Sequence, residues 1–285
     1  MKCNFICVKI KDNNNIINLN NGKIQEIFKL SIGNNIINFN YMKNQNESSN
    51  KNKEIIYYKK FVKKNIGKMI YKTNEYNKII KIFNQEFISN NIKRSKIIIN
   101  NKQYDLKENI IIENQILRIE IKFLDIIINL NSMFEDCKYL FSIHNFQNII
   151  TKYLKTIFNL FYGCSSLLYI DDISNWSINN INDISKLFCQ CSSLESLPDI
   201  SKWNMNNVNY INKLLYGCSN LQYLPDISIW NVNNIIDMNC LFYNCSSLNS
   251  IPDISKWNTS NLNFLFFIYP NDEYSLIRNK DLLYS

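Results

Sequence analysis

Five cysteines recur at a fixed interval of 27 residues in the C-terminal half of the sequence, at Cys137, Cys164, Cys191, Cys218 and Cys245. Thiols at this spacing could serve as metal ligands, as a ladder of disulfides or as a column of buried thiols. Zinc needs four ligands that converge on one point, whereas residues one interval apart form a line. Side chains in a column run parallel, which disfavours disulfides. We favour buried thiols that pack as small apolar groups, and we expect no metal and no cofactor.

A column of carboxylates keeps the same interval, at Asp172, Asp199, Asp226 and Asp253. Carboxylates in a row could bind cations or contact a ligand. Alternatively, each carboxylate caps the backbone amide groups next to it. We favour capping, and the cation-binding interpretation stays open.

The single histidine, His144, has no serine or cysteine nucleophile pattern around it. We expect a surface or capping side chain rather than a catalytic base. Motifs for phosphate binding, zinc hydrolysis or a serine nucleophile are absent from the sequence, and five glycines leave little material for a phosphate cradle. We therefore expect that the protein is not an enzyme.

The cysteines and carboxylates belong to a longer repeat. Tryptophans share the interval, at Trp176, Trp203, Trp230 and Trp257. They could be recognition aromatics or plates in a core, and we favour the core. A fixed period between about 20 and 50 residues indicates a solenoid, a propeller or an array, and this one is too short for a propeller blade.

One repeat, starting at Cys191, changes its apolar spacing midway. Residues 194–200 place an apolar side chain at every third position, which suggests a short extended stretch. Residues 208–215 show the spacing of a short helix with one apolar face, and Gly217 suits a left-handed helix C-cap. We predict an α/β fold: a leucine-rich-repeat-like solenoid with one strand and one short helix per repeat.

Three motifs carry a resemblance to a known family. They are Gly163-Cys164-Ser165-Ser166-Leu167, then Leu197-Pro198-Asp199-Ile200-Ser201-Lys202-Trp203-Asn204, then Asn207-Val208. Over residues 126–269 the chain resembles the BspA-like leucine-rich-repeat proteins, in their mycoplasma surface-lipoprotein branch. The resemblance implies a right-handed solenoid used for binding and adhesion, commonly on cell surfaces and without a catalytic centre.

The N-terminus shows neither a signal peptide nor a lipobox before Cys3 or Cys7. The longest nonpolar runs fall well short of the roughly 18 residues that a membrane span requires. We therefore expect a cytoplasmic protein without a membrane span. Display at the cell surface is the alternative that the family resemblance implies.

The N-terminal half is basic and shows no period. Residues 1–131 hold 23 Lys and Arg against 11 Asp and Glu, a balance of +12 in a chain whose total is +8. A basic surface could attract nucleic acid or an anionic membrane, and we favour a solvated lysine surface. With 49 Ile and no Ala in the chain, an all-helical bundle is disfavoured.

We divide the chain into four parts, at residues 1–66, 67–125, 126–269 and 270–285. The first is a small α+β region, with a β-grasp topology as one option, strands at 3–10 and 16–19 and a helix at 23–30. The second is another small α+β region, with a helix at 85–90 and strands at 69–71, 79–83, 95–99, 104–106 and 116–123. The third holds about five repeats of the solenoid, and the fourth is a C-terminal tail.

Positions that vary between the fixed leucines are the best candidates for contact with a partner. They are Glu195, Ser196, Gln222, Tyr223, Asn249 and Ser250. We predict a non-catalytic module that binds a protein through the concave strand face of the solenoid. One alternative is a BspA-type cell-surface adhesin. Another is a binder of nucleic acid or anionic lipid through residues 57–64, where aromatic and lysine side chains interleave.

Overall fold

The structure is a computed structural model, and it describes residues 16–20, 23–32, 35–42 and 65–262. The chain divides into two compact units, Met1–Asn65 and Ile66–Ser285. The strand predicted at 3–10, the basic aromatic segment 57–64 and the tail 270–285 lie outside the described residues.

The first unit contains an antiparallel sheet of three strands in the order β1-β2-β3. The strands are β1 (Ile16–Asn20), β2 (Lys23–Ile32) and β3 (Asn35–Met42). The strand predicted at 16–19 is confirmed, and the helix predicted at 23–30 is wrong because β2 occupies it and pairs with β3. In this segment Phe28, Leu30 and Ile32 alternate with polar residues, which is the period of a strand.

The second unit begins with strands and one α-helix. They are β4 (Ile66–Lys72), β5 (Lys78–Lys81), α2 (Gln85–Asn91), β6 (Ser95–Ile99), β7 (Lys102–Tyr104), β8 (Asn109–Ile112) and β9 (Ile116–Phe123). The strands and the helix predicted between residues 69 and 123 are confirmed in type and order, except that β7 ends at Tyr104 and shares only that residue with the strand predicted at 104–106. Strand β8 was not predicted, and it pairs with β5 as a separate two-stranded ribbon.

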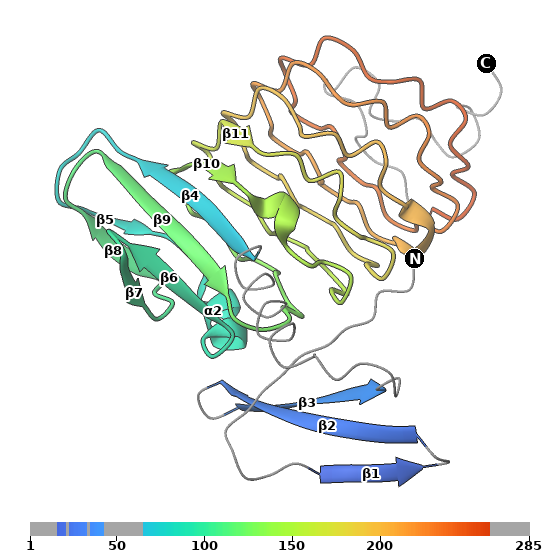
Figure 1. The fold of residues 1–285 in the computed structure, drawn as a ribbon. Coiled ribbons are helices and arrows are strands. Elements are labelled where there is room, and N and C mark those ends of the chain that lie inside the picture. Colours follow the sequence, from blue (N-terminus) through green and yellow to red (C-terminus); the bar gives the residue numbers. More distant parts are fainter. Residues whose placement is uncertain (1–15, 21–22, 33–34, 43–64, 263–285) are drawn as a thin grey trace. The chain divides into compact units, whose positions relative to one another are not determined.

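A mixed six-stranded sheet joins this region to the repeats. Its order is β11-β10-β4-β9-β6-β7, where β10 (Leu140–His144) and β11 (Tyr169–Ile170) belong to the first two repeats. Strand β10 pairs antiparallel with β4 and parallel with β11. Figure 1 shows β10 and β11 at the start of a series of stacked loops, which we call the repeat stack (residues 130–262).

The prediction of an α/β leucine-rich-repeat solenoid is wrong. Within residues 65–262, α2 is the single α-helix, and no repeat contains the predicted strand and helix pair. The extended half of each later repeat forms only isolated bridges, such as Ser196 with Tyr223. The described residues form a sheet-rich fold, and the repeats that follow its mixed sheet consist mainly of turns.

Residues 208–215, which were predicted to form a helix, show why the repeats consist of turns instead. Main-chain N–H groups of alternate residues donate to the next repeat, from Ile211 to Asp237 and from Lys213 to Asn239. The N–H groups between them close short turns within the repeat, as Leu214 does on Ile211. An α-helix would direct all of these donors four residues back along its own chain. The next repeat satisfies them instead.

Two backbone positions in each of these turn segments are left-handed. Lys213 has φ 55° and Gly217 has φ 74°. The left-handed conformation predicted for Gly217 is confirmed, although it ends no helix. Such residues interrupt a right-handed helix, and glycine adopts this conformation without steric cost.

Stacked phenylalanines run through the interior of the repeat stack. The rings of Phe134 and Phe161 are 5.6 Å apart and nearly parallel, and those of Phe161 and Phe188 are 5.7 Å apart. Phe134 also contacts Phe83, just before α2, at 5.7 Å. One continuous core therefore supports both the six-stranded sheet and the repeats.

Candidate functional site

The six residues predicted to contact a partner are all exposed. The main-chain N–H of Gln222 donates to the carbonyl of Glu195 at 3.0 Å, and that of Asn249 donates to the carbonyl of Gln222 at 3.2 Å. Ser196 and Tyr223 form a parallel bridge. Residues one interval apart therefore lie side by side, and the six residues form two adjacent rows.

An earlier repeat extends both rows. The N–H of Leu168 donates to the carbonyl of Phe141 at 2.9 Å, and Tyr169 pairs with Ser142 between β11 and β10. Leu168 and Tyr169 are exposed. The prediction missed them, although they share the phase of Glu195 and Ser196. We call the exposed members of both rows the strand-face surface: Leu168, Tyr169, Glu195, Ser196, Gln222, Tyr223, Asn249 and Ser250.

The only histidine of the chain lies beside the first residues of this surface. Nδ1 of His144 is 3.1 Å from Oδ1 of Asp171, and Nε2 is 2.9 Å from Oγ of Ser142. The other carboxylate oxygen of Asp171 accepts the main-chain N–H of Asn145 at 2.6 Å. The imidazole stacks on Tyr169 with ring centres 5.4 Å apart, and the negative charge of Asp171 raises the pKa of that tyrosine.

A serine, a histidine and a carboxylate in this order occur in acyl-transfer enzymes, where the serine hydroxyl attacks a carbonyl. Here Ser142 is 3% exposed and lies within β10, opposite Ile70 of β4. Its hydroxyl is covered. The hydrogen bonds to Ser142 and Asp171 hold the His144 ring in place, and that ring in turn positions Tyr169 at the surface by stacking on it.

The sequence contains a signal for this cluster that the prediction did not use. His144 and Asp171 are one interval apart, and later repeats place Pro198, Pro225 and Pro252 at the same phase. A stack brings such positions together. His144 and Asp171 stand at this phase in place of proline, and these two residues pair with each other.

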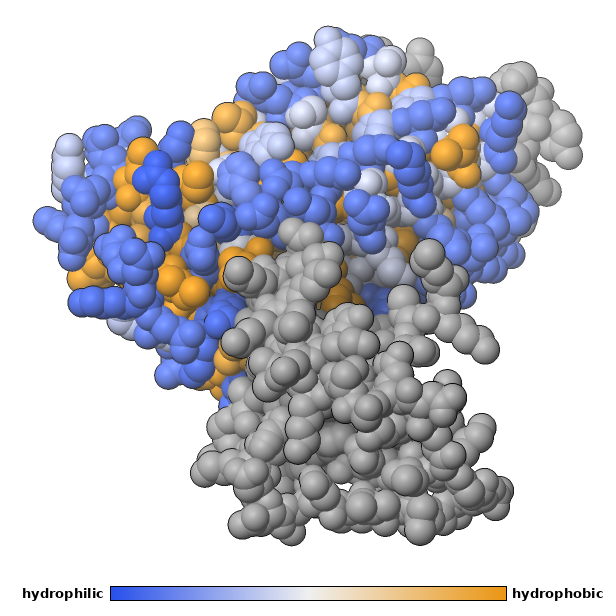
Figure 2. All heavy atoms as spheres, in the orientation of Figure 1, coloured by the Kyte–Doolittle hydropathy of each residue, from blue (hydrophilic) through white to orange (hydrophobic). Residues whose placement is uncertain are grey.

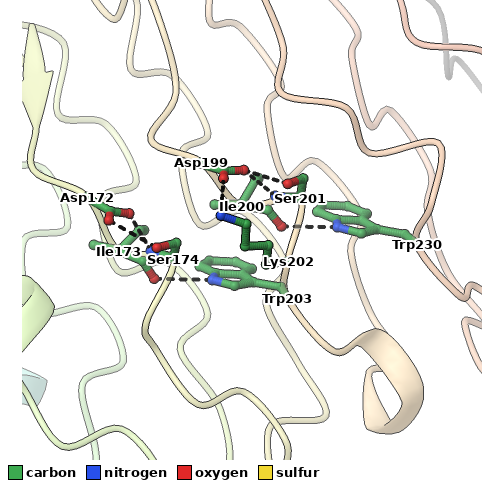
Figure 3. A network of polar contacts seen from close by, with 9 residues as sticks. All are labelled: Asp172, Ile173, Ser174, Asp199, Ile200, Ser201, Lys202, Trp203 and Trp230. Atoms are coloured by element: carbon green, nitrogen blue, oxygen red, sulfur yellow. Dashed lines mark hydrogen bonds and ion pairs between the residues drawn. The ribbon is translucent and has the colours of Figure 1, made fainter.

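The aspartate column lies at the surface, and each member closes a local turn. Asp199 accepts the main-chain N–H of Ser201 at 3.0 Å and the Ser201 hydroxyl at 2.6 Å. These hydrogen bonds lower the pKa of Asp199. Figure 3 shows this turn beside the equivalent turn of Asp172 and Ser174. Asp226 and Asp253 form the same turn with Ser228 and Ser255.

The tryptophan column lies inside the stack. The indole N–H groups of Trp176, Trp203 and Trp230 donate to main-chain carbonyls 30 residues earlier, at 2.9, 3.3 and 3.1 Å. Figure 3 shows two of these bonds, to Ile173 and Ile200. Trp257 is equally buried, but its indole nitrogen has no partner within the described ranges.

The cysteine column is fully buried, and its members are free thiols. Sγ of Cys164, Cys191, Cys218 and Cys245 donates to the carbonyl 30 residues earlier, at 3.0 to 3.1 Å. Burial raises the pKa of these thiols, in Cys245 to about 12. They are therefore neutral at physiological pH and link successive repeats.

Within the described part of the chain, no group of three or more His, Cys, Asp or Glu residues could hold a metal ion. No described helix has both the length and the apolar character needed to cross a bilayer.

The repeat region matches a known protein family. The family described as "Mycoplasma protein of unknown function, DUF285" matches residues 128–224 and 197–273. Together these ranges cover residues 128–273, just over half of the 285 residues. No curated protein and no solved structure matches the chain. The resemblance to mycoplasma repeat proteins thus holds at the level of this family.

Proposed function

Because the chain belongs to the DUF285 family of mycoplasma proteins, whose function is unknown, we propose a role from its own repeat surface. The chain is a non-catalytic module that binds a protein partner through the strand-face surface. One observation carries this proposal. At the exposed rows the residue type changes from repeat to repeat, as from Tyr169 to Ser196, whereas the buried phases keep cysteine and tryptophan.

The composition of the surface suits a protein partner. Tyr223 is 63% exposed, and Tyr169 is held in place by the His144 ring. Tyrosines of this kind are enriched at protein interfaces because they combine a large apolar ring with a hydroxyl, at low entropic cost. Glu195 is the single charged residue of the strand-face surface, so the charge at its centre is low.

Site-specific photo-crosslinking on the full chain tests the proposal. A benzophenone amino acid at position 223 should give one discrete crosslinked polypeptide, and the additional substitution Tyr169→Ala should weaken that product at least fivefold. The matched control carries the same group at position 76, because Tyr76 is also strongly exposed but lies outside the repeats. The same product from both positions, or none from position 223, would reject the proposal.

The same surface would also serve an adhesin of the BspA type, which binds its partner outside the cell. Protease treatment of intact cells that produce the chain separates the two cases. Digestion of the repeats in intact cells supports the adhesin. Protection until lysis supports a partner inside the cell.

A further inference from the structure

A groove separate from the strand-face surface lies between the β5–β8 ribbon and strands β6, β7 and β9. Its volume is about 670 Å³, and pockets for small ligands span roughly 300–1,000 Å³. Strand β9 pairs with β6 only between Glu120 and Phe123. The preceding residues 116–118 therefore line the groove on the side where β6 has ended.

Isoleucine is the most frequent residue in the lining of the groove, at Ile79, Ile99, Ile110, Ile111, Ile112 and Ile116, and asparagines line it as well. Ile79 and Ile111 pair directly across the β5–β8 ribbon and are 65% and 56% exposed. Figure 2 shows apolar side chains gathered at the surface over the part of the molecule that contains β4 to β9. Exposed apolar side chains that gather in one place can mark a binding site.

Three charged side chains line the same groove: Arg118, Lys107 and Glu113. Among the described residues, the ion pairs of this region include neither Arg118 nor Glu113. The Lys107 ammonium lies 5.1 Å from the centre of the Tyr104 ring. The groove therefore combines an apolar floor with a net positive charge and a guanidinium that has no carboxylate partner.

We propose that this groove binds a long-chain carboxylate, an amphiphile of the fatty-acid class. Its alkyl chain lies along the isoleucines, covering Ile79 and Ile111, and its carboxylate binds Arg118. A guanidinium binds a carboxylate through two parallel N–H donors. A cationic amphiphile would meet like charge at Arg118 and Lys107, and a neutral one would leave the guanidinium without a partner.

Calorimetric titration of the full chain with decanoate and dodecanoate, below their micelle concentrations, tests the apolar part. Each buried methylene tightens binding by up to about fourfold. Dodecanoate should therefore bind roughly tenfold more tightly than decanoate. Equal affinities for the two chain lengths, or no binding of either, would overturn the proposal.

Variants at exposed positions locate the site. Ile111→Asp should weaken dodecanoate binding at least tenfold, because it places a carboxylate on the floor of the groove. The matched control is Ile229→Asp, since Ile229 is 67% exposed and lies in the repeat stack; it should leave binding unchanged. Arg118→Gln should weaken dodecanoate about tenfold and should not weaken dodecyltrimethylammonium. Circular dichroism verifies that each variant is folded.

Three results would contradict the proposal. Equal weakening by Ile229→Asp would show that binding is not confined to the groove. Equal affinity for dodecyltrimethylammonium would remove the carboxylate specificity. Binding to phosphatidylglycerol vesicles without binding of monomeric dodecanoate would assign the groove to a membrane surface.

Discussion

Replacing Trp203 by phenylalanine should destabilise the chain clearly more than the same change at Trp257. Both indoles are buried to the same degree, so the two substitutions remove similar apolar volume. They differ in hydrogen bonding, because the Trp203 indole donates to the carbonyl of Ile173, whereas the Trp257 indole has no partner within the described ranges. The difference between the two variants therefore combines the bond lost at Trp203 with the unsatisfied donor removed at Trp257.

The magnitude follows from the two environments. The carbonyl of Ile173 also accepts the main-chain N–H of Trp176 at 3.0 Å, so it keeps one donor after the substitution. The loss at Trp203 is therefore one hydrogen bond, about 0.5–1.5 kcal/mol. At Trp257 the substitution removes an unsatisfied buried donor, which relieves about 1–3 kcal/mol. We expect Trp203→Phe to lower the free energy of unfolding by about 1.5–4.5 kcal/mol more than Trp257→Phe does.

Urea unfolding followed by far-ultraviolet circular dichroism measures this difference, because each substitution removes one of the four tryptophans and so changes the fluorescence signal from variant to variant. Phe242→Ala is the control for the C-terminal end of the stack. Phe242 is fully buried, and its truncation should cost about 3–5 kcal/mol if that end unfolds together with the rest. Equal losses for the two tryptophan variants, with Phe242→Ala strongly destabilising, would refute the reasoning.

Four further predictions concern the columns and the serine cluster. Cys164, Cys191 and Cys218 should resist iodoacetamide in the folded chain, whereas the half-buried Cys240 should react first among the cysteines that the structure describes, as measured by mass spectrometry. Burial raises the pKa of the buried thiols above the value of about 8.5 that cysteine has in an unfolded chain. The stability that these thiols contribute is therefore complete below about pH 8.5 and is lost as the pH rises above it. A constant urea midpoint between about pH 8 and 11 would contradict this. Added Ca²⁺ should leave the melting temperature unchanged, because each aspartate of the column already binds the serine two residues later, and a rise would restore the cation-binding interpretation. A fluorophosphonate probe should not label the covered Ser142; labelling that His144→Gln abolishes would indicate an enzyme.

The 27-residue interval indicates which residues become neighbours, but it does not determine the conformation of the backbone. The apolar spacing in residues 208–215 suits one face of a helix, and it also suits successive three-residue turns. The acceptors of the main-chain N–H groups distinguish a helix from successive turns, and here these acceptors lie in the next repeat. The left-handed residue Lys213 carries no sequence signal, and only Gly217 does.

The candidate site could be predicted from the sequence only in part. The rows that contain Glu195 and Ser196 follow from variation at a fixed phase, and the same argument extends to Leu168 and Tyr169. The pairing of His144 with Asp171 can be predicted only by aligning one repeat with the next. Inspection of the residues next to His144 in the sequence does not reveal it. The groove could not be predicted, because it depends on where β6 separates from β9.

The bonds between repeats restrict how the length of this chain can change. Some main-chain donors reach 26 residues forward, as from Leu215 to Leu241, and others 27 residues back, as from Gln222 to Glu195. Side-chain donors include ones that reach back by 28 or 30 residues, as from Asn234 to Asn206 and from Cys245 to Leu215. Tandem duplication of one whole period would regenerate every one of these pairs at the new junction. An insertion one residue shorter or longer would mismatch all of them at once. Gain or loss of complete 27-residue periods is therefore the change in length that leaves these bonds intact.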